Sequence, residues 1–372
     1  MNMGAPRIKI LLSFDHELSL GRTTSFLRNL FAPTDRLIEL AGELCVPINI
    51  FTDVLCAIRF KEWDEDGFYK LYSEQIIRTI RAGHDVQLHL HPHWMDSEFH
   101  DGRFFPASSF TFSVFYNRDW PKNIEGIVTT GIKFLTALCR KADPFYKCIA
   151  YRAGGYNLAP RTEDILAALY KNGIRLDSSI PRGFTFESDL SKIDYRKIKS
   201  KKPNWFIPLT GPADGEADAG LFEIPIATRP RNIINNLPYV IKRLWIKTGL
   251  TRKGNFHPAG VAIHVGRSSI WKKGRSFLLP ASAWMLEFDD QTGSVRSLMK
   301  IFDRYIKKYR QNDLGQVILS TISHPKAMGE YSFDLMCGFI ERIRSDYGHH
   351  AEFCTYSQIY RELSSQGMIE KA

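Results

Sequence analysis

The chain has 372 residues, which is enough for about two average domains or for one large α/β barrel with insertions. Hydrophobic residues make up 44% and charged residues 24%, so a globally disordered chain is excluded. Lysine and arginine outnumber aspartate and glutamate by 50 to 40, and the resulting net charge of +10 favours an anionic partner: a phosphate-bearing substrate, nucleic acid or an anionic membrane surface.

Strand-like and helix-like patterns alternate along most of the chain. Strands are predicted at 8–14, 47–51, 85–89, 147–151, 174–177 and 317–322. Helices are predicted at 35–44, 67–82, 124–140, 161–171, 294–309 and 333–343. This alternation indicates parallel βαβ units and therefore an α/β fold. Residues 95–123 are predicted to form a long loop, and 182–290 a proline-rich elaboration that contributes to substrate binding.

The N-terminal residues and the cysteines favour a cytoplasmic protein. The apolar run 8–14 is interrupted by Lys9 and followed at once by Asp15, so it is too short for a secretion signal. No window approaches the roughly 18 apolar residues of a transmembrane helix. The six cysteines form no CxxC pair, which argues against a zinc knuckle or a dithiol redox site. We expect them to be small buried residues in a reducing compartment.

Ionisable residues gather at the ends of five predicted strands. They are Asp15, Glu17, His89, His91, His93, Arg152, Asp177 and His324. In a parallel barrel the carboxyl ends of the strands meet on one face, so these side chains could share one pocket. Histidines with a carboxylate suit Zn²⁺ or a similar divalent ion, and the remaining groups are free for acid–base chemistry.

Each of these residues also has an ordinary structural explanation. Asp15 or Asp177 could form a turn or cap a helix, and Arg152 could form a structural ion pair. His324 precedes a proline and could belong to a turn, and HLHPH at 89–93 could be a solvated loop. Because all five strand ends carry such residues, their joint occurrence favours a functional site.

At these residues the chain resembles the polysaccharide deacetylases, the NodB-like fourth carbohydrate-esterase family. A bacterial branch found with surface-polysaccharide genes, the WbmS and WalW type, resembles it further. The matching segments, in family order, are SFDHE at 13–17, GHDVQLHLHPH at 83–93, RAGGY at 152–156, DS at 177–178 and TISH at 321–324. The resemblance covers 1–180 well and 315–330 locally. It implies a distorted (β/α) barrel of about seven parallel strands. It also implies a single domain over 1–372, with a basic insertion at 182–290.

The resemblance implies a divalent metal, foremost Zn²⁺, with Co²⁺, Ni²⁺ or Mn²⁺ as alternatives. Its two histidine ligands match His89 and His93. The family's metal-binding aspartate is His16 here, and alternate residues of a strand point the same way, so Glu17 is the preferred third ligand. His16 and Asp15 remain alternative third ligands.

The resemblance also implies roles around that metal. Asp15 is expected to be the base, His324 the acid, Arg152 the cation that orients Asp15, and Asp177 the group that orients His324. The substrate side is expected to involve three further residues. They are His91, which could also be a ligand, Trp94 and Tyr156.

The implied reaction is hydrolysis of an N-acetyl amide on an amino sugar of a bacterial surface polysaccharide, or of its nucleotide- or lipid-linked precursor. A pyrophosphate link fits the basic stretch 224–286, whose 63 residues include eleven Lys and Arg and no Asp or Glu. The stretch could instead be a solvated face or touch a membrane surface, since 239–247 is basic and amphipathic. No nucleic-acid motif accompanies the charge. Two other functions stay open: a non-catalytic carbohydrate-binding module on the same fold, and an amidase for a non-sugar amide.

Overall fold

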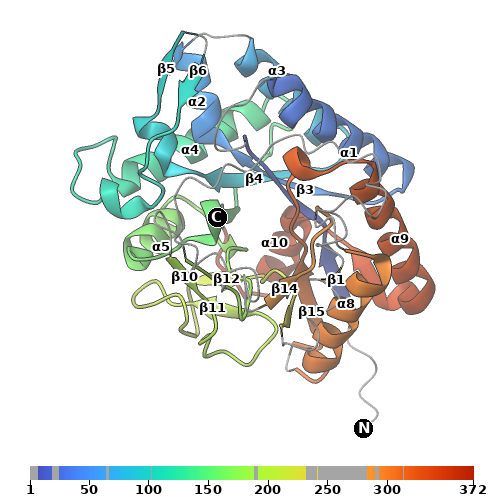
Figure 1. Cartoon of the computed structure of the whole chain (residues 1–372). Helices are drawn as coiled ribbons and strands as arrows, with labels where there is room; N and C mark the ends of the chain where they lie inside the picture. Colours follow the sequence, from blue (N-terminus) through green and yellow to red (C-terminus); the bar gives the residue numbers. More distant parts are fainter. Residues whose placement is uncertain are drawn as a thin grey trace.

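Two sheets built mainly of parallel strands form the centre of the computed structural model, and helices surround them (Figure 1). The structure describes residues 7–18, 25–63, 67–101, 103–187, 192–231, 241, 283–289, 293–312 and 314–372. All statements below concern these residues.

The larger sheet has seven strands in the order β11-β12-β8-β7-β4-β3-β2. Their bounds are β2 (Ser13–His16), β3 (Asn49–Asp53), β4 (Asp85–Leu90), β7 (Ala150–Ala153), β8 (Leu176–Asp177), β11 (Trp205–Ile207) and β12 (Leu221–Glu223). Neighbouring strands are parallel except for the antiparallel pair β11 and β12. The predicted α/β class and its mostly parallel sheet are therefore confirmed.

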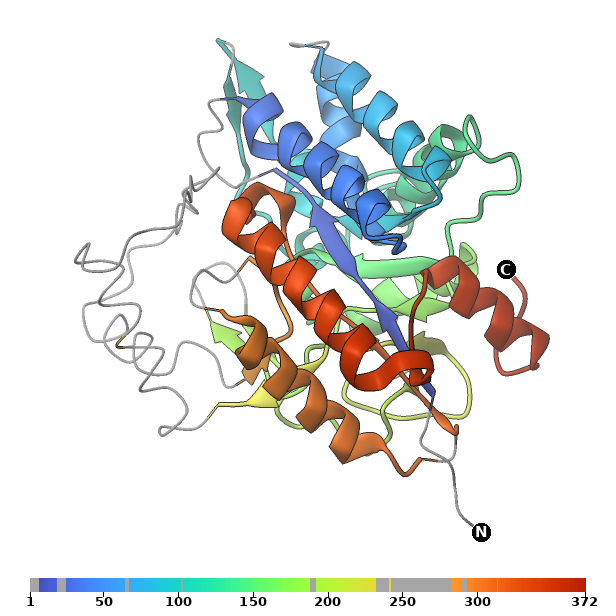
Figure 2. The same ribbon diagram turned by 90° about the vertical axis from the view of Figure 1, so that its right-hand side faces the viewer.

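A second sheet has the order β15-β1-β16, all parallel, with β1 (Arg7–Leu11), β15 (Gln316–Ser320) and β16 (Ala351–Phe353). Only Leu12 separates β1 from β2, so one extended segment runs through both sheets (Figure 2). At the other side, the Ser320 N–H donates to Pro225 O at 3.1 Å and the Ala227 N–H donates to Ser320 O at 2.9 Å. Barrel closure remains a prediction, with which these two bonds agree.

The helices lie outside the strands. They are α1 (Ala32–Glu43), α2 (Val54–Trp63), α3 (Phe68–Arg81), α4 (Ile124–Cys139), α5 (Thr162–Lys171), α8 (Val295–Tyr309), α9 (Glu330–Tyr347) and α10 (Tyr356–Ser365). Local chemistry sets several ends: Asn123 accepts from the Gly126 N–H at the start of α4, and Ser294 forms a capping box at the start of α8. Gly83, at φ +83°, follows α3 in the left-handed region.

The segments between the main helices and strands contain short strands and short helices. The predicted loop 95–123 contains the hairpin of β5 (Glu98–His100) and β6 (Arg103–Phe105) and the short helix η3 (Phe112–Phe115). Helices α2 and α10 were not predicted. The described part of 182–290 contains the pair β9 (Thr185–Glu187) and β10 (Lys192–Asp194), the pair β13 (Thr228–Pro230) and β14 (Ala283–Met285), and the main-sheet strands β11 and β12. The division into a domain with an insertion stays a prediction.

Most of the basic stretch 224–286 lies outside the described residues, so its predicted contacts remain predictions. Within the part of the chain that the structure describes, no helix is both long enough and apolar enough to cross a membrane.

The strand interiors are buried but not uniformly apolar. Every residue of β2, β3 and β4 is buried, as expected for parallel strands that are covered on both sides. Polar residues nevertheless occupy buried positions near the carboxyl ends, among them Asp15, His89, Arg152 and Asp177. Because a buried charge is costly without a partner, this polar group is where a site is expected.

Candidate metal and hydrolytic site

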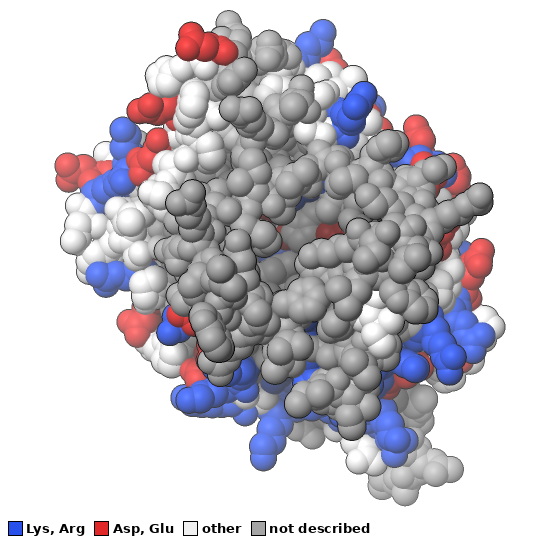
Figure 3. All heavy atoms as spheres, in the orientation of Figure 1, with Lys and Arg blue, Asp and Glu red and all other residues white. Residues whose placement is uncertain are grey.

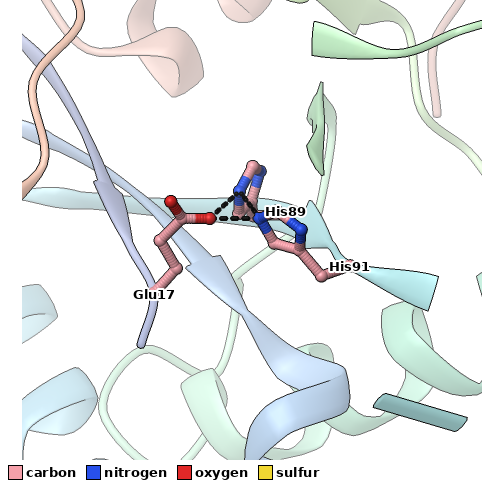
Figure 4. A group of neighbouring side chains, drawn as sticks. All are labelled: Glu17, His89 and His91. Atoms are coloured by element: carbon pink, nitrogen blue, oxygen red, sulfur yellow. Dashed lines mark hydrogen bonds and ion pairs between the residues drawn. The ribbon is translucent and has the colours of Figure 1, made fainter. Parts of the chain in front are cut away.

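Glu17, His89 and His91 bring one potential ligand atom each to the same place (Figure 4). The three atoms all lie within 4.8 Å of one another. The His89 Nε2 is 3.0 Å from Glu17 Oε2 and 3.1 Å from His91 Nε2, and His91 Nε2 also contacts Glu17 Oε2. Two imidazole nitrogens and a carboxylate oxygen around one point are a donor set that suits Zn²⁺ or a related ion.

The backbone explains how the two histidines come to face the same way. His89 lies in β4, and His91 continues the extended chain with φ −109° and ψ 98°, so their side chains share one side. The His89 Nδ1–H donates to Arg152 O at 2.9 Å on the neighbouring strand β7. This bond leaves Nε2 free to face Glu17, the arrangement expected of a metal-ligating histidine.

Gly154 makes room for this arrangement, which gives the RAGG segment a physical role. A Cβ at Gly154 would lie 2.5 Å from Leu90 O and 2.8 Å from His91 Nδ1. A larger residue would therefore push against both the end of β4 and the His91 ring.

His93, which the resemblance matched to a ligand, lies outside this group. The short helix η2 (Pro92–Asp96) starts directly after His91, so the strand alternation stops there. The His93 ring is 1% exposed, packs near Trp94 and Phe110, and both its ring nitrogens lack a hydrogen-bond partner among the described residues. In this structure the histidine pair that faces Glu17 is His89 with His91.

The alternatives for the third ligand separate clearly. His16 points away from the group, with Nδ1 3.0 Å from Thr52 Oγ1 and Nε2 2.9 Å from Gln75 Oε1. Burial lowers the pKa of His16 to about 4, so it is a neutral packing residue. Asp15 Oδ2 stays 4.0 Å from His89 Nε2, whereas Glu17 is in direct contact with both histidines.

Asp15 is instead held by Arg152. The Arg152 Nη1 donates to Asp15 Oδ1 at 2.8 Å, and both side chains are buried. The rest of the guanidinium is fully occupied: Nε donates to Ser178 O, and Nη2 lies within 3.0 Å of the hydroxyls of Ser13, Ser178 and Ser320. Burial lowers the pKa of Arg152, but the charge of Asp15, the neighbouring Tyr356 and the hydrogen bond to Asp15 together raise it overall. One Asp15 oxygen is thus fixed, and Oδ2 is left for chemistry.

His324 faces the same place from the end of β15. Its Nε2 is 3.9 Å from Asp15 Oδ2 and 3.7 Å from Glu17 Oε1. Its Nδ1 is 2.7 Å from Asp289 Oδ2, and its backbone N–H donates to the same oxygen at 3.0 Å. Burial lowers the pKa of His324, yet the hydrogen bond and charge of Asp289 raise it overall.

The prediction that Asp177 orients His324 is therefore corrected, because Asp289 occupies that place. Asp177 accepts from the Ser179 N–H at 3.0 Å and from its hydroxyl at 2.8 Å. It also faces Glu223, whose pKa is raised well above its ordinary value by burial and then by the Asp177 charge. Asp177 thus packs against Ser179 and Glu223 at the β8–β12 side of the sheet.

The two aromatic residues expected on the substrate side differ. Trp94 is 2% exposed and donates its indole N–H to Asp53 Oδ2 at 2.7 Å, so it is a packing residue and cannot offer a face to a sugar. Tyr156 is half-buried, and its pKa is raised by burial and then by the charges of Asp15 and nearby carboxylates, which sets it beside the site. Tyr156 remains a candidate substrate contact.

Three residues at the site were not predicted. They are Asp53 at the end of β3, Asp289 three residues after the apolar run 283–286, and Lys326 two residues after His324. The two aspartates follow strand-like runs, so the rule that selected Asp15 could have found them. Lys326 does not directly follow a strand-like run, so this rule could not have found it.

The electrostatics of the group favour a bound cation. Burial raises the pKa of Glu17, but the charges of Lys326 and His91 and the bonds to both histidines bring it well below its ordinary value. Burial lowers the pKa of His89, while Asp15 and Glu17 raise it to about 9. The carboxylates therefore draw positive charge to this point. Red atoms of acidic residues are visible in the hollow at the centre of this face (Figure 3).

No protein-family model and no curated protein matches the chain. Among solved structures, a polysaccharide deacetylase from Mycobacterium smegmatis aligns over 99% of this chain and 94% of its own, with 13% identity and a TM-score of 0.49. The Puue allantoinase aligns over 97% and 92%, with 13% identity and a TM-score of 0.48. A polysaccharide deacetylase from Pseudomonas aeruginosa PAO1 aligns over 98% and 93%, with 13% identity and a TM-score of 0.46. Because the sequence identity is only 13%, the chemistry of this chain must be inferred from the residues of its own site.

Proposed function

We propose that this chain is a metal-dependent hydrolase that removes the acetyl group from an N-acetylated amino sugar of a bacterial surface polysaccharide, or of its nucleotide- or lipid-linked precursor. The observation that carries the proposal is the Glu17, His89 and His91 group beside Asp15 and His324. The finer parts, namely the sugar, the pyrophosphate link, the barrel closure, a cytoplasmic location and membrane contact through 224–286, rest on the sequence.

Glu17, His89 and His91 would hold the ion, and Zn²⁺ fits their donor atoms best. When bound, such an ion polarises an amide carbonyl and makes water a stronger acid. Asp15 takes the proton from the attacking water at Oδ2, because Arg152 holds Oδ1. The water oxygen then bonds to the acyl carbon.

His324 completes the reaction by giving a proton to the leaving nitrogen. Its Nδ1–H is directed at Asp289, so Nε2 faces the site. As the carbon–nitrogen bond breaks, the proton on Nε2 passes to the amine, and acetate and the free amino sugar result. His324 then recovers a proton from Asp15, either directly or through water.

The purified full chain tests the proposal through metal analysis and acetate release from N-acetylated sugars, free and nucleotide-linked. Asp15→Asn is expected to lower kcat by roughly 10²- to 10⁴-fold, the usual contribution of a general base. Asp194→Asn is the control, because Asp194 is paired with Arg196 on the surface. Near-normal release by Asp15→Asn would refute the assignment.

Two other outcomes would identify the alternative functions. Bound metal without release from any acetylated sugar would favour a carbohydrate-binding module. Release from a non-sugar amide, with none from sugars, would favour an amidase of another substrate class.

A further inference from the structure

Lys326 brings a positive charge to the Glu17 oxygen that His89 and His91 do not contact. Its Nζ is 2.8 Å from Glu17 Oε1, whereas His89 and His91 contact Oε2. The two oxygens of one carboxylate are therefore divided between an ammonium group and the candidate metal group. Lys326 takes no part in the proposed reaction.

The position of Lys326 is well fixed. Its Nζ lies 3.3 Å from Leu18 O, which gives the ammonium a second acceptor. It belongs to the short helix η5 (Pro325–Ala327), which directly follows His324 and its bonds to Asp289. Its side chain is only 18% exposed, so water and salt screen its charge less than they would at the surface.

Three carboxylates of the site each have a nitrogen partner even without a metal. Arg152 faces Asp15, Lys326 faces Glu17, and His324 faces Asp289. A divalent ion at Glu17 Oε2 would share this carboxylate with Lys326, and the two cations would repel each other. The carboxylate would then neutralise less of the charge of the ion.

We propose that Lys326 is a positioning residue. By binding Glu17 Oε1 it leaves Oε2 facing the metal, and its charge weakens the carboxylate as a metal donor. It thereby exchanges metal affinity for a more electrophilic ion, which polarises the acyl oxygen more strongly. This inference rests on the proposed function and deepens it. If the charge of Lys326 is removed, metal affinity should rise and kcat should fall.

The test compares Lys326→Gln, which keeps a donor but loses the charge, with Lys326→Arg, which keeps both. Zn²⁺ is titrated into the metal-free full chain by competition with a chelator at fixed pH and ionic strength. Lys326→Gln is expected to bind Zn²⁺ roughly tenfold more tightly and to lower kcat roughly tenfold, while Lys326→Arg stays near the original protein.

Lys326→Met provides a second charge-removing variant, should Gln at this position impair folding, and the same tightening is expected. Unchanged or weaker Zn²⁺ binding by both neutral variants would overturn the inference, because loss of a merely supporting contact weakens metal binding. If the original protein binds no Zn²⁺ or related ion, the proposed function itself fails. The two failures are thus distinguishable.

Discussion

His91 and His93 are two residues apart in the sequence, yet only His91 faces Glu17. On a strand both side chains would share one side, which is why the sequence allowed either as a ligand. Pro92 begins a short helix, and the backbone turn at that point directs His93 into a pocket of aromatic side chains. The residue type indicated metal chemistry, but one backbone turn determined which of the two histidines faces Glu17.

Replacing each histidine separately tests this assignment. His91→Ala is expected to weaken Zn²⁺ binding by more than about 100-fold, beyond the effect of a residue that only supports a ligand. His93→Ala is expected to leave Zn²⁺ affinity within a few-fold while lowering stability, because it leaves a cavity beside Trp94. Chelator-competition titration and thermal unfolding measure the two effects. The reverse order of affinities would show that His93 is the ligand.

The hydrogen bond between His324 and Asp289 predicts a pH effect. The raised pKa of His324 keeps the acid protonated to a higher pH than burial alone would allow. Asp289→Asn keeps an oxygen acceptor for Nδ1–H but removes the charge, so the pKa of His324 falls. The basic limb of the kcat/KM profile should move to lower pH.

Asp177→Asn is the matched control for that experiment, since Asp177 contacts Ser179 and not His324. Its pH profile should keep the original basic limb even if the protein is less stable. An unchanged limb in Asp289→Asn would remove Asp289 from the proton-transfer chemistry.

At the scale of elements, the site depends on how closely β7 approaches the end of β4. The pair is parallel, with His89 opposite Arg152 and Leu90 opposite Ala153. Gly154 follows directly, where any side chain would meet Leu90 O and the His91 ring. Strand pairing and the absence of a side chain at Gly154 therefore position the His91 ring beside Glu17.

Gly154→Ala is expected to displace His91 and to weaken Zn²⁺ binding roughly 10- to 100-fold, with a stability loss of about 1–3 kcal/mol from overpacking. Gly42→Ala is the control, because a Cβ there meets nothing within 4 Å. Titration and denaturant unfolding of both variants give the comparison. Equal Zn²⁺ affinity in the two variants would contradict the role of Gly154.

At the scale of the whole molecule, the site joins distant parts of the chain. Asp15 and Glu17 come from its start, while Asp289, His324 and Lys326 come from its end. The N-terminal strand β1 pairs with β15, and His324 follows four residues after β15 ends. A metal held here binds only the folded chain, so it should stabilise the protein as a unit.

Free Zn²⁺ at about 100 times its Kd should therefore stabilise the protein by about 2.7 kcal/mol, and a chelator should remove this stabilisation. Glu17→Gln should show little of the effect, because it loses a charged ligand. Thermal unfolding with and without Zn²⁺ is the measurement. Equal stabilisation of Glu17→Gln would mean that the ion binds elsewhere.

Local sequence patterns were enough to predict the α/β class, most of the strands and helices, and the gathering of ionisable residues at strand ends. Those features depend on local periodicity and on the rule that parallel strands end at one edge. Helix α2 escaped prediction because its apolar residues form no clear face. Helix α10 has a clear apolar face and a capping box at Thr355, so its pattern could have been recognised.

Which of these residues meet depends on the folded chain. The turn at Pro92 leaves His91, and not His93, facing Glu17. His16 is hydrogen-bonded to Thr52 and Gln75, away from this group. The C-terminal part of the chain brings Asp289 to His324 and Lys326 to Glu17. The physical reason is that residue type and spacing record what a side chain can do. Its partners depend on contacts between segments that lie from 35 to 309 residues apart.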